Sequence, residues 1–366
     1  MRFFAPTDVY VEKNCVKNHK EKLLSLGTKA FIITGRHSSA VNGSLSDVTE
    51  ILSEAGIPYD IFTEIEENPS VETVAKASEI GKAVKADFVI GIGGGSPLDA
   101  AKAIALLMAN PEETSDCLYT AKNLKALPIA AIPTTCGTGS EVTPNAVLTR
   151  HEFKTKKSIS YQLYPDLALV DGKYLKYAGQ NLILNTAADA LAHCVESRLH
   201  TKANIYNHMF SEYGLKLWAS LKPYIKKEKE LDEKAYETLM LASTVAGMAI
   251  AQTSTSLPHA LSYDITYNYG VPHGKACGTF LAAYMKTYAC HKTEDVNHVL
   301  SLLEFTSVDE FGAFLRETLG EITIKRTDLD IYTQNMLQNP GKLATYPFNL
   351  TENEVRRILE ESLNLQ

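Results

Sequence analysis

Short apolar runs alternate with helix-like segments along the first half of the chain. The runs are rich in β-branched and aromatic residues and are too short for typical helices. The predicted strands are residues 30–34, 59–62, 88–92 and 128–132. The predicted helices between them are residues 45–55, 71–85 and 96–108. Because strands joined by helices usually run parallel, this order predicts a parallel sheet covered by helices.

The second half has a different pattern, in which apolar positions follow helical spacing and strand patterns are hard to find. The predicted helices are residues 191–199, 207–221, 234–252, 275–288 and 352–363. The last of them follows Thr351, a plausible N-cap residue. We therefore expect an α/β domain over residues 1–175 and an all-α domain over residues 176–366.

Composition and charge exclude several classes of protein. The chain has 366 residues and a formal net charge of -7, so nothing in its overall charge favours nucleic acid or an anionic membrane as a partner. No segment approaches the roughly 18 uninterrupted apolar residues of a membrane span, and the N-terminus lacks the apolar core of a secretory signal. The six cysteines are scattered without a C-x-x-C pair, which is typical of free thiols in a reducing compartment. We expect a cytoplasmic protein.

A glycine-rich turn follows the predicted strand 88–92 and precedes a helix. Glycines let backbone N–H groups approach a pyrophosphate, and a helix N-terminus adds unpaired donors and partial positive charge. The motif departs from G-x-G-x-x-G because Ser96 occupies the last glycine position. A simple tight turn is the alternative. The position of the motif between a strand and a helix favours nucleotide binding.

A second polar loop, residues 133–141, follows the predicted strand 128–132. Its hydroxyl groups and glycines at the end of a strand suit the phosphates and nicotinamide of a dinucleotide. A turn stabilised by Ser and Thr side chains is an equally good interpretation of this loop alone.

Three histidines and one aspartate form a candidate metal site. Asp189 and His193 are four residues apart, a spacing that places both on one face of a helix. His259 and His273 each follow a proline, and we expect each to lie near a helix end. One carboxylate with three imidazoles suits Fe²⁺ or Zn²⁺ rather than Mg²⁺ or Ca²⁺. Taken singly, each residue could equally be an ordinary polar residue.

At these motifs the chain resembles the iron-containing, or group III, alcohol dehydrogenases. The matching segments are residues 67–74 (ENPSVETV), 91–105 (GIGGGSPLDAAKAIA), 132–143 (IPTTCGTGSEVT), 188–197 (ADALAHCVES) and 258–274 (PHALSYDITYNYGVPHG). The resemblance implies a Rossmann-like dinucleotide-binding domain followed by a helical domain, with the metal in the cleft between them. It also implies a homodimer, Fe²⁺ by family habit with Zn²⁺ or another divalent ion possible, and hydride transfer between NAD(P)(H) and a small primary or secondary alcohol or diol and its aldehyde or ketone.

The resemblance assigns roles to particular residues. The implied metal ligands are Asp189, His193, His259 and His273. The implied cofactor contacts are Asn68, Gly94, Gly95, Ser96, Asp99, Thr134, Thr135, Thr138, Asn145, Val147 and Lys157. The last assignment is loose because Lys156 is adjacent.

Two departures from the family pattern carry predictions. Tyr263 stands where many members have a histidine for proton relay, so we expect its hydroxyl to be the candidate catalytic group, although it is a poorer base at neutral pH. After strand 30–34, NAD-preferring members tend to place an aspartate on the ribose 2′-hydroxyl. This chain has Gly35 there, followed by Arg36 and by the hydroxyls of Ser38 and Ser39, which could bind a 2′-phosphate. We expect NADP(H) to be favoured over NAD(H).

A related enzyme class offers an alternative function. Lyases similar to dehydroquinate synthase share this fold and use NAD⁺ and a metal ion. They need several basic groups around a phosphorylated substrate, and the second half shows no clear Lys/Arg cluster beside the candidate ligands. The dehydrogenase is therefore the preferred prediction.

Overall fold

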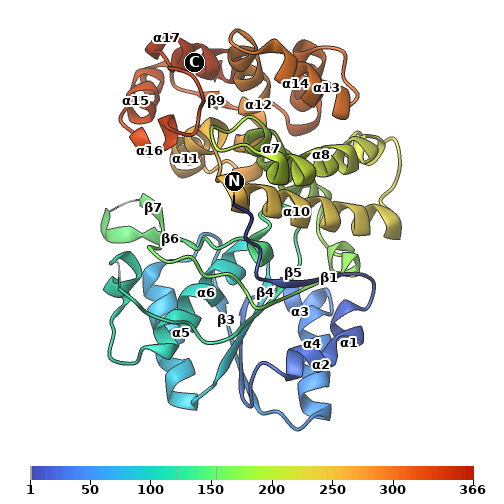
Figure 1. Cartoon of the computed structure of the whole chain (residues 1–366), viewed down its shortest axis with the longest axis vertical. Helices are drawn as coiled ribbons and strands as arrows, with labels where there is room; N and C mark the ends of the chain where they lie inside the picture. The colour runs from blue at the N-terminus through green and yellow to red at the C-terminus, as the bar shows by residue number, and fades with distance from the viewer. Residues whose placement is uncertain (1, 121, 154) are drawn as a thin grey trace. The chain divides into compact units, whose positions relative to one another are not determined.

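The computed structural model describes residues 2–120, 122–153 and 155–366, and it divides into two compact units. The first unit is Ala5–Ala178. The second is Gly179–Gln366, together with the N-terminal residues up to Phe4. Figure 1 shows a sheet in the first unit and a set of helices in the second. The boundary expected near residue 175 lies slightly before the one at Gly179.

A six-stranded parallel sheet forms the centre of the first unit (Figure 1). In spatial order its strands are β1 (Asp8–Val11), β8 (Leu167–Val170), β5 (Ile129–Pro133), β4 (Phe88–Gly93), β2 (Ala30–Gly35) and β3 (Tyr59–Ile65). The chain leaves β2 toward β3 and leaves β4 toward β5, so the winding reverses between β2 and β4. Ligands of open α/β sheets bind at such a reversal, beyond the carboxyl ends of the strands.

Both faces of this sheet are buried, which explains the continuous apolar runs of its central strands. Along β2, Phe31 and Ile33 belong to one apolar cluster, while Ala30 and Ile32 belong to the cluster on the opposite face. The first cluster includes residues of α5 and α6, and the second includes residues of α1, α2 and α4. The alternation follows from the two-residue side-chain period of a strand.

Six α-helices, four short 3-10 helices and one hairpin accompany the sheet in the described residues of the first unit. The α-helices are α1 (Cys15–Asn18), α2 (Lys20–Leu24), α3 (Ser38–Val41), α4 (Ser44–Glu54), α5 (Val71–Val84) and α6 (Gly95–Ala109). The antiparallel hairpin is β6 (Val147–Arg150) with β7 (Thr155–Ser158).

The second unit is helical apart from one short ladder. Its helices are α7 (Gln180–Arg198), α8 (Ile205–Ser220), α9 (Lys222–Ile225), α10 (Glu233–Thr253), α11 (Leu257–Tyr269), α12 (His273–Ala289), α13 (Thr293–Leu302), α14 (Val308–Leu319), α15 (Arg326–Leu337), α16 (Pro340–Leu343) and α17 (Glu352–Ser362). Two-residue strands β9 (Thr323–Ile324) and β10 (Asn364–Leu365) pair in parallel. Thr351 caps α17 through a capping box with Glu354, as its sequence indicates.

The predicted fold class is confirmed: a parallel-sheet domain precedes a helical domain. The four predicted strands and three predicted helices of the first half each match an observed element. The strands β1 and β8 are additional, as is the β6–β7 hairpin. Among the described residues, none of the helices combines the length and apolar character needed to cross a membrane.

Candidate metal and cofactor sites

The four predicted metal ligands come from three helices of the second unit. Asp189 and His193 lie one turn apart in α7, and both are buried. His259 lies in the first turn of α11, and His273 is the first residue of α12, so both histidines are at helix N-termini as expected. Both α11 and α12 pack against α7, which brings these distant parts of the sequence together.

The ligand atoms of these residues surround one point. The Oδ1 atom of Asp189 faces the Nε2 atoms of three imidazoles: 3.8 Å from His193, 3.3 Å from His259 and 3.8 Å from His273. The Nε2 atoms of His193 and His259 are 2.9 Å apart. Ligand atoms bonded to one ion at about 2.0–2.1 Å lie roughly 3 Å apart at a right angle and roughly 4 Å apart on opposite sides of the ion, so these separations fit a shared cation.

A buried atom without a partner supports the fit. Asp189 is 3% exposed, and its Oδ1 has no hydrogen-bond partner among the described residues. A buried carboxylate oxygen left unpaired is costly, and a cation at this point would satisfy it. The donor set, one carboxylate and three imidazoles, matches Fe²⁺ or Zn²⁺.

A fifth donor lies beside the four predicted ones. Cys277, one turn after His273 in α12, is fully buried, and its Sγ is 3.6 Å from Nε2 of His273. The ligand atoms of Asp189, His259, His273 and Cys277 all lie within 4.8 Å of one another. Sequence reasoning treated this cysteine only as a free thiol. The spacing of His273 and Cys277 repeats that of Asp189 and His193, and this was the available signal.

Electrostatics favour the charge states that ligation needs at two of the predicted ligands. Burial lowers the pKa of His193 to about 4, which keeps its imidazole neutral at pH 7. Burial alone would raise the pKa of Asp189, but the neighbouring imidazoles, His193 first, outweigh burial and lower it. A neutral imidazole and an ionised carboxylate are the forms that bind a metal ion.

Glu196 orients one of the histidines and was not predicted. It is fully buried in α7, and its Oε2 accepts a hydrogen bond from Nδ1 of His259. Its Oε1 accepts from the backbone N–H of Ser256 at 2.8 Å and of His259 at 3.2 Å. The bond to Nδ1 fixes the tautomer in which Nε2 faces Asp189. The sequence signal was a carboxylate three residues after His193.

Tyr263 lies next to the candidate metal site. It follows His259 by one turn of α11, and its ring stacks on that of His273, with centroids 6.1 Å apart and an interplanar angle of 11°. It is 37% exposed. The structure thus places the phenol beside a candidate ligand and open to solvent, where a substrate could reach it.

The two predicted cofactor loops pack directly against each other at the ends of β4 and β5. A methyl group on Gly95 would lie 2.6 Å from Cγ2 of Thr138, and one on Gly94 would lie 3.0 Å from Oγ1 of Thr135. Thr134 donates its backbone N–H to Gly93 at 2.9 Å. Gly94 is also the N-cap residue of α6 and has no side chain that could cap the helix, which leaves first-turn amides to a phosphate.

A buried ion pair holds these loops. The Nζ of Lys102, which is fully buried in α6, lies 3.6 Å from Asp99 Oδ1 and donates to Ser140 Oγ at 2.8 Å. It also donates to the carbonyl oxygens of Thr143 at 2.9 Å and Asn145 at 2.8 Å. Asp99 accepts from Ser140 Oγ at 2.5 Å and from the N–H of Val147 at 2.8 Å. The Asp99 carboxylate therefore positions the loops, while the Asn145 side chain is exposed and accessible.

Asn68 connects the same loops to the β6–β7 hairpin. Its N–H donates to Ser96 Oγ at 3.0 Å, and its carbonyl accepts from Thr149 Oγ1 at 2.8 Å. Its Oδ1 accepts from Lys156 Nζ at 2.8 Å. Lys157 is instead exposed, near the ring of Tyr119. Of the two adjacent lysines, Lys156 is the one that faces the predicted cofactor residues.

The predicted 2′-phosphate residues lie after β2. Gly35 ends this strand, and Ser38 begins α3 with an exposed side chain. Ser39 is buried, and its Oγ accepts a hydrogen bond from Thr34 Oγ1 at 2.6 Å. Ser38 and Arg36 are therefore better placed than Ser39 to meet a ligand.

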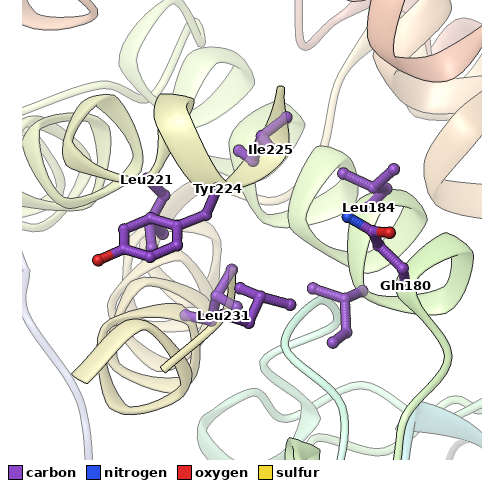
Figure 2. A pocket seen from close by; sticks show the side chains of 8 residues that line it. Gln180, Leu184, Leu221, Tyr224, Ile225 and Leu231 are labelled. Atoms are coloured by element: carbon purple, nitrogen blue, oxygen red, sulfur yellow. The ribbon is translucent and has the colours of Figure 1, made fainter. Parts of the chain in front are cut away.

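A separate pocket in the second unit is almost entirely apolar (Figure 2). Its lining residues are Gln180, Ile183, Leu184, Leu221, Tyr224, Ile225, Leu231 and Leu239. None of these eight residues is a metal-ligand type, and none belongs to the candidate sites. We assign no function to this pocket.

The fold and the candidate sites define a class: a protein with a dinucleotide-type parallel sheet and a glycine-rich turn, followed by a helical domain that brings an aspartate and three histidines together. Residues 6–172 match the family "Iron-containing alcohol dehydrogenase", and residues 183–363 match the C-terminal domain of the same family. The chain belongs to the iron-containing alcohol dehydrogenase family, whose activity is the NAD(P)-dependent interconversion of alcohols and aldehydes. The dehydrogenase prediction is thereby confirmed over the lyase alternative.

Individual relatives agree with this assignment. The chain is 31% identical to an NADPH-dependent butanol dehydrogenase of Clostridium saccharobutylicum, over 99% of this chain and 92% of that protein. It is 29% identical to an NAD-dependent methanol dehydrogenase of Bacillus methanolicus, over 82% of this chain and 79% of that protein. An iron-containing alcohol dehydrogenase of known structure from Thermotoga maritima superposes with a TM-score of 0.91 at 35% identity, covering 99% of each chain.

Proposed function

We propose that the chain is an NADP(H)-preferring dehydrogenase of small primary or secondary alcohols and diols, using a divalent cation held by Asp189, His193, His259 and His273. The unpaired, buried Oδ1 of Asp189 among three imidazole nitrogens is the observation that carries this proposal. Fe²⁺ is the first candidate and Zn²⁺ the second. A homodimer in the cytoplasm is part of the proposal and rests on the family resemblance and on the free thiols.

Each part of the proposed site has its own chemical role. When bound, a divalent cation acts as a Lewis acid toward the substrate oxygen, and the nicotinamide carries the hydride. The glycine turn and the threonine loop bind and orient the dinucleotide. Glu196 holds the His259 ring in one orientation. The partial exposure of Tyr263 and its ring contact with His273 support its hydroxyl as the group that moves a proton.

The NADP(H) preference is supported by the residues that follow β2. Gly35, Arg36 and Ser38 bring a cation and a hydroxyl and no carboxylate that would repel a 2′-phosphate. Relatives of both preferences occur: the butanol dehydrogenase is named for NADPH and the methanol dehydrogenase for NAD.

The test is a steady-state comparison of NADPH and NADH with a panel of short aldehydes, after metal analysis of anaerobically purified protein. We expect kcat/KM to be higher with NADPH. In Gly35→Asp the new carboxylate should lower kcat/KM for NADPH roughly tenfold or more, while the uncharged Gly35→Asn serves as a matched control. A parent preference for NADH would refute the cofactor assignment, and absence of activity across the panel in metal-loaded protein would refute the function.

Proton transfer is tested separately by Tyr263→Phe. If the hydroxyl moves the proton, the variant should lose activity and change the shape of the pH–rate profile, with metal content unaltered. An unchanged profile would remove Tyr263 from the mechanism.

A further inference from the structure

Cys277 lies among the candidate metal ligands, although it was not predicted to be one. Its side chain lies in α12 on the same helical face as His273, because the two residues are one turn apart. Its Sγ is 3.6 Å from Nε2 and 3.9 Å from Nδ1 of that imidazole. Cys277 is fully buried.

The separations match those of ligands that share one ion. A thiolate at about 2.3 Å and an imidazole at about 2.0–2.1 Å from one ion lie roughly 3–4 Å apart for ligand–metal–ligand angles between about 90° and 120°. The distance from Cys277 Sγ to His273 Nε2 is 3.6 Å. The compact set of ligand atoms within 4.8 Å also contains Asp189 and His259. The unpaired Oδ1 of Asp189 independently indicates that a cation belongs at this point.

We propose that Cys277 is a thiolate ligand of the metal ion, in addition to the aspartate and histidines. The inference rests on the metal site of the proposed function. On binding, the S–H bond breaks, the proton leaves to solvent, and a sulfur lone pair forms the bond to the cation. The thiolate and the Asp189 carboxylate then balance the two positive charges of the ion. A soft sulfur donor favours Zn²⁺ or Fe²⁺ over Mg²⁺ or Mn²⁺.

Cobalt substitution of the full chain tests the bond directly. Co²⁺ bound to a thiolate gives an intense sulfur-to-cobalt charge-transfer band in the near ultraviolet, whereas nitrogen and oxygen ligands alone do not. We expect this band in the parent protein at one equivalent of Co²⁺ and its loss in Cys277→Ala and Cys277→Ser. Zn²⁺ affinity, measured by competition with a chromophoric chelator, should fall at least about tenfold in Cys277→Ala.

Cys194→Ala is the matched control. Cys194 is also buried and adjoins His193 in sequence, but its sulfur packs against Gly214 of α8. This variant should keep both the band and the Zn²⁺ affinity. Stoichiometric Co²⁺ binding without a charge-transfer band in the parent would overturn the thiolate ligand and leave the proposed function standing. Failure of the parent to bind one equivalent of Co²⁺ or Zn²⁺ would overturn both.

Discussion

The proposed cofactor loops and the proposed metal site use opposite means to present groups to a ligand. In the first unit the ligand-facing positions are backbone and glycine, and the charged side chains Asp99 and Lys102 are committed to holding the loops together. In the second unit the ligand-facing atoms belong to charged and polar side chains, and their supports are other side chains such as Glu196.

This difference follows from the ligands. A pyrophosphate is large and is bound by many N–H donors, so close approach of the backbone matters most. A cation is a point charge that needs a few strong donors at fixed distances. The first kind of site should be sensitive to changes in loop position, and the second to changes in a single side chain's charge or orientation.

The largest expected effect is on the cofactor side, in Lys102→Met. The substitution leaves Asp99 without its buried cation and removes the donor to Ser140 and two carbonyl groups. Breaking a buried pair in this way typically costs about 3–5 kcal/mol of unfolding free energy. Denaturant unfolding followed by circular dichroism measures the loss, and cofactor affinity should fall with it.

Lys29→Met is the matched control for this comparison. Lys29 pairs with Asp60 at 3.2 Å, but both side chains are partly exposed. Such pairs contribute about 0–1 kcal/mol. Equal costs for the two variants would show that Lys102 is not a loop-positioning residue.

The candidate metal ligands were easier to find in the sequence than the residues that surround them. Asp189 and His193 were recognisable because helical spacing alone puts them on one face, and the prolines before His259 and His273 indicated helix starts. The convergence of the three helices depends on tertiary packing, which spacing does not encode. Glu196 and Cys277 were missed for that reason. Each is singled out only by its contact in the folded chain, Glu196 with His259 and Cys277 with His273.

In the first unit the glycine-rich turn could be found in the sequence, but the contacts made by its individual side chains could not. Asp99 was predicted as a cofactor contact, and the structure shows its carboxylate engaged with Ser140, Val147 and Lys102. The strands β1 and β8 were also missed, because each has only four residues and so short a segment gives little periodicity to detect. The central strands were predicted because burial on both faces makes them continuously apolar.

A smaller effect is expected on the metal side, in Glu196→Gln. The amide keeps the size of the side chain but removes the charge that holds Nδ1–H of His259. Loss of such a supporting partner typically weakens metal binding about 10–100-fold. Competition titration with Zn²⁺ measures this, with Glu212→Gln, a partly exposed residue of α8, as the control. If the Zn²⁺ affinity were unchanged, the role of Glu196 would be limited to accepting the hydrogen bond from the Ser256 backbone N–H.

The smallest effect, and the sharpest test of the comparison, concerns Gly95→Ala. The added methyl group would lie 2.6 Å from Cγ2 of Thr138, so the Thr138 side chain must shift or the two loops must separate. Overpacking of this kind costs about 1–2 kcal/mol. Isothermal titration should also show weaker cofactor binding, with metal affinity unaltered. At Gly179→Ala, where nothing lies within 4 Å of the added atom, no comparable loss is expected.

The double variant Gly95→Ala/Thr138→Ser separates steric crowding from other causes. Serine lacks the Cγ2 methyl that makes the closest contact, while it keeps the hydroxyl that accepts from the Ser140 N–H. If the loops must stay close to bind the dinucleotide, this second substitution should restore part of both the stability and the cofactor affinity. Recovery of stability without recovery of affinity would mean that Thr138 itself contacts the cofactor. No recovery of either would place the requirement for glycine in the backbone's approach to its ligand rather than in loop packing.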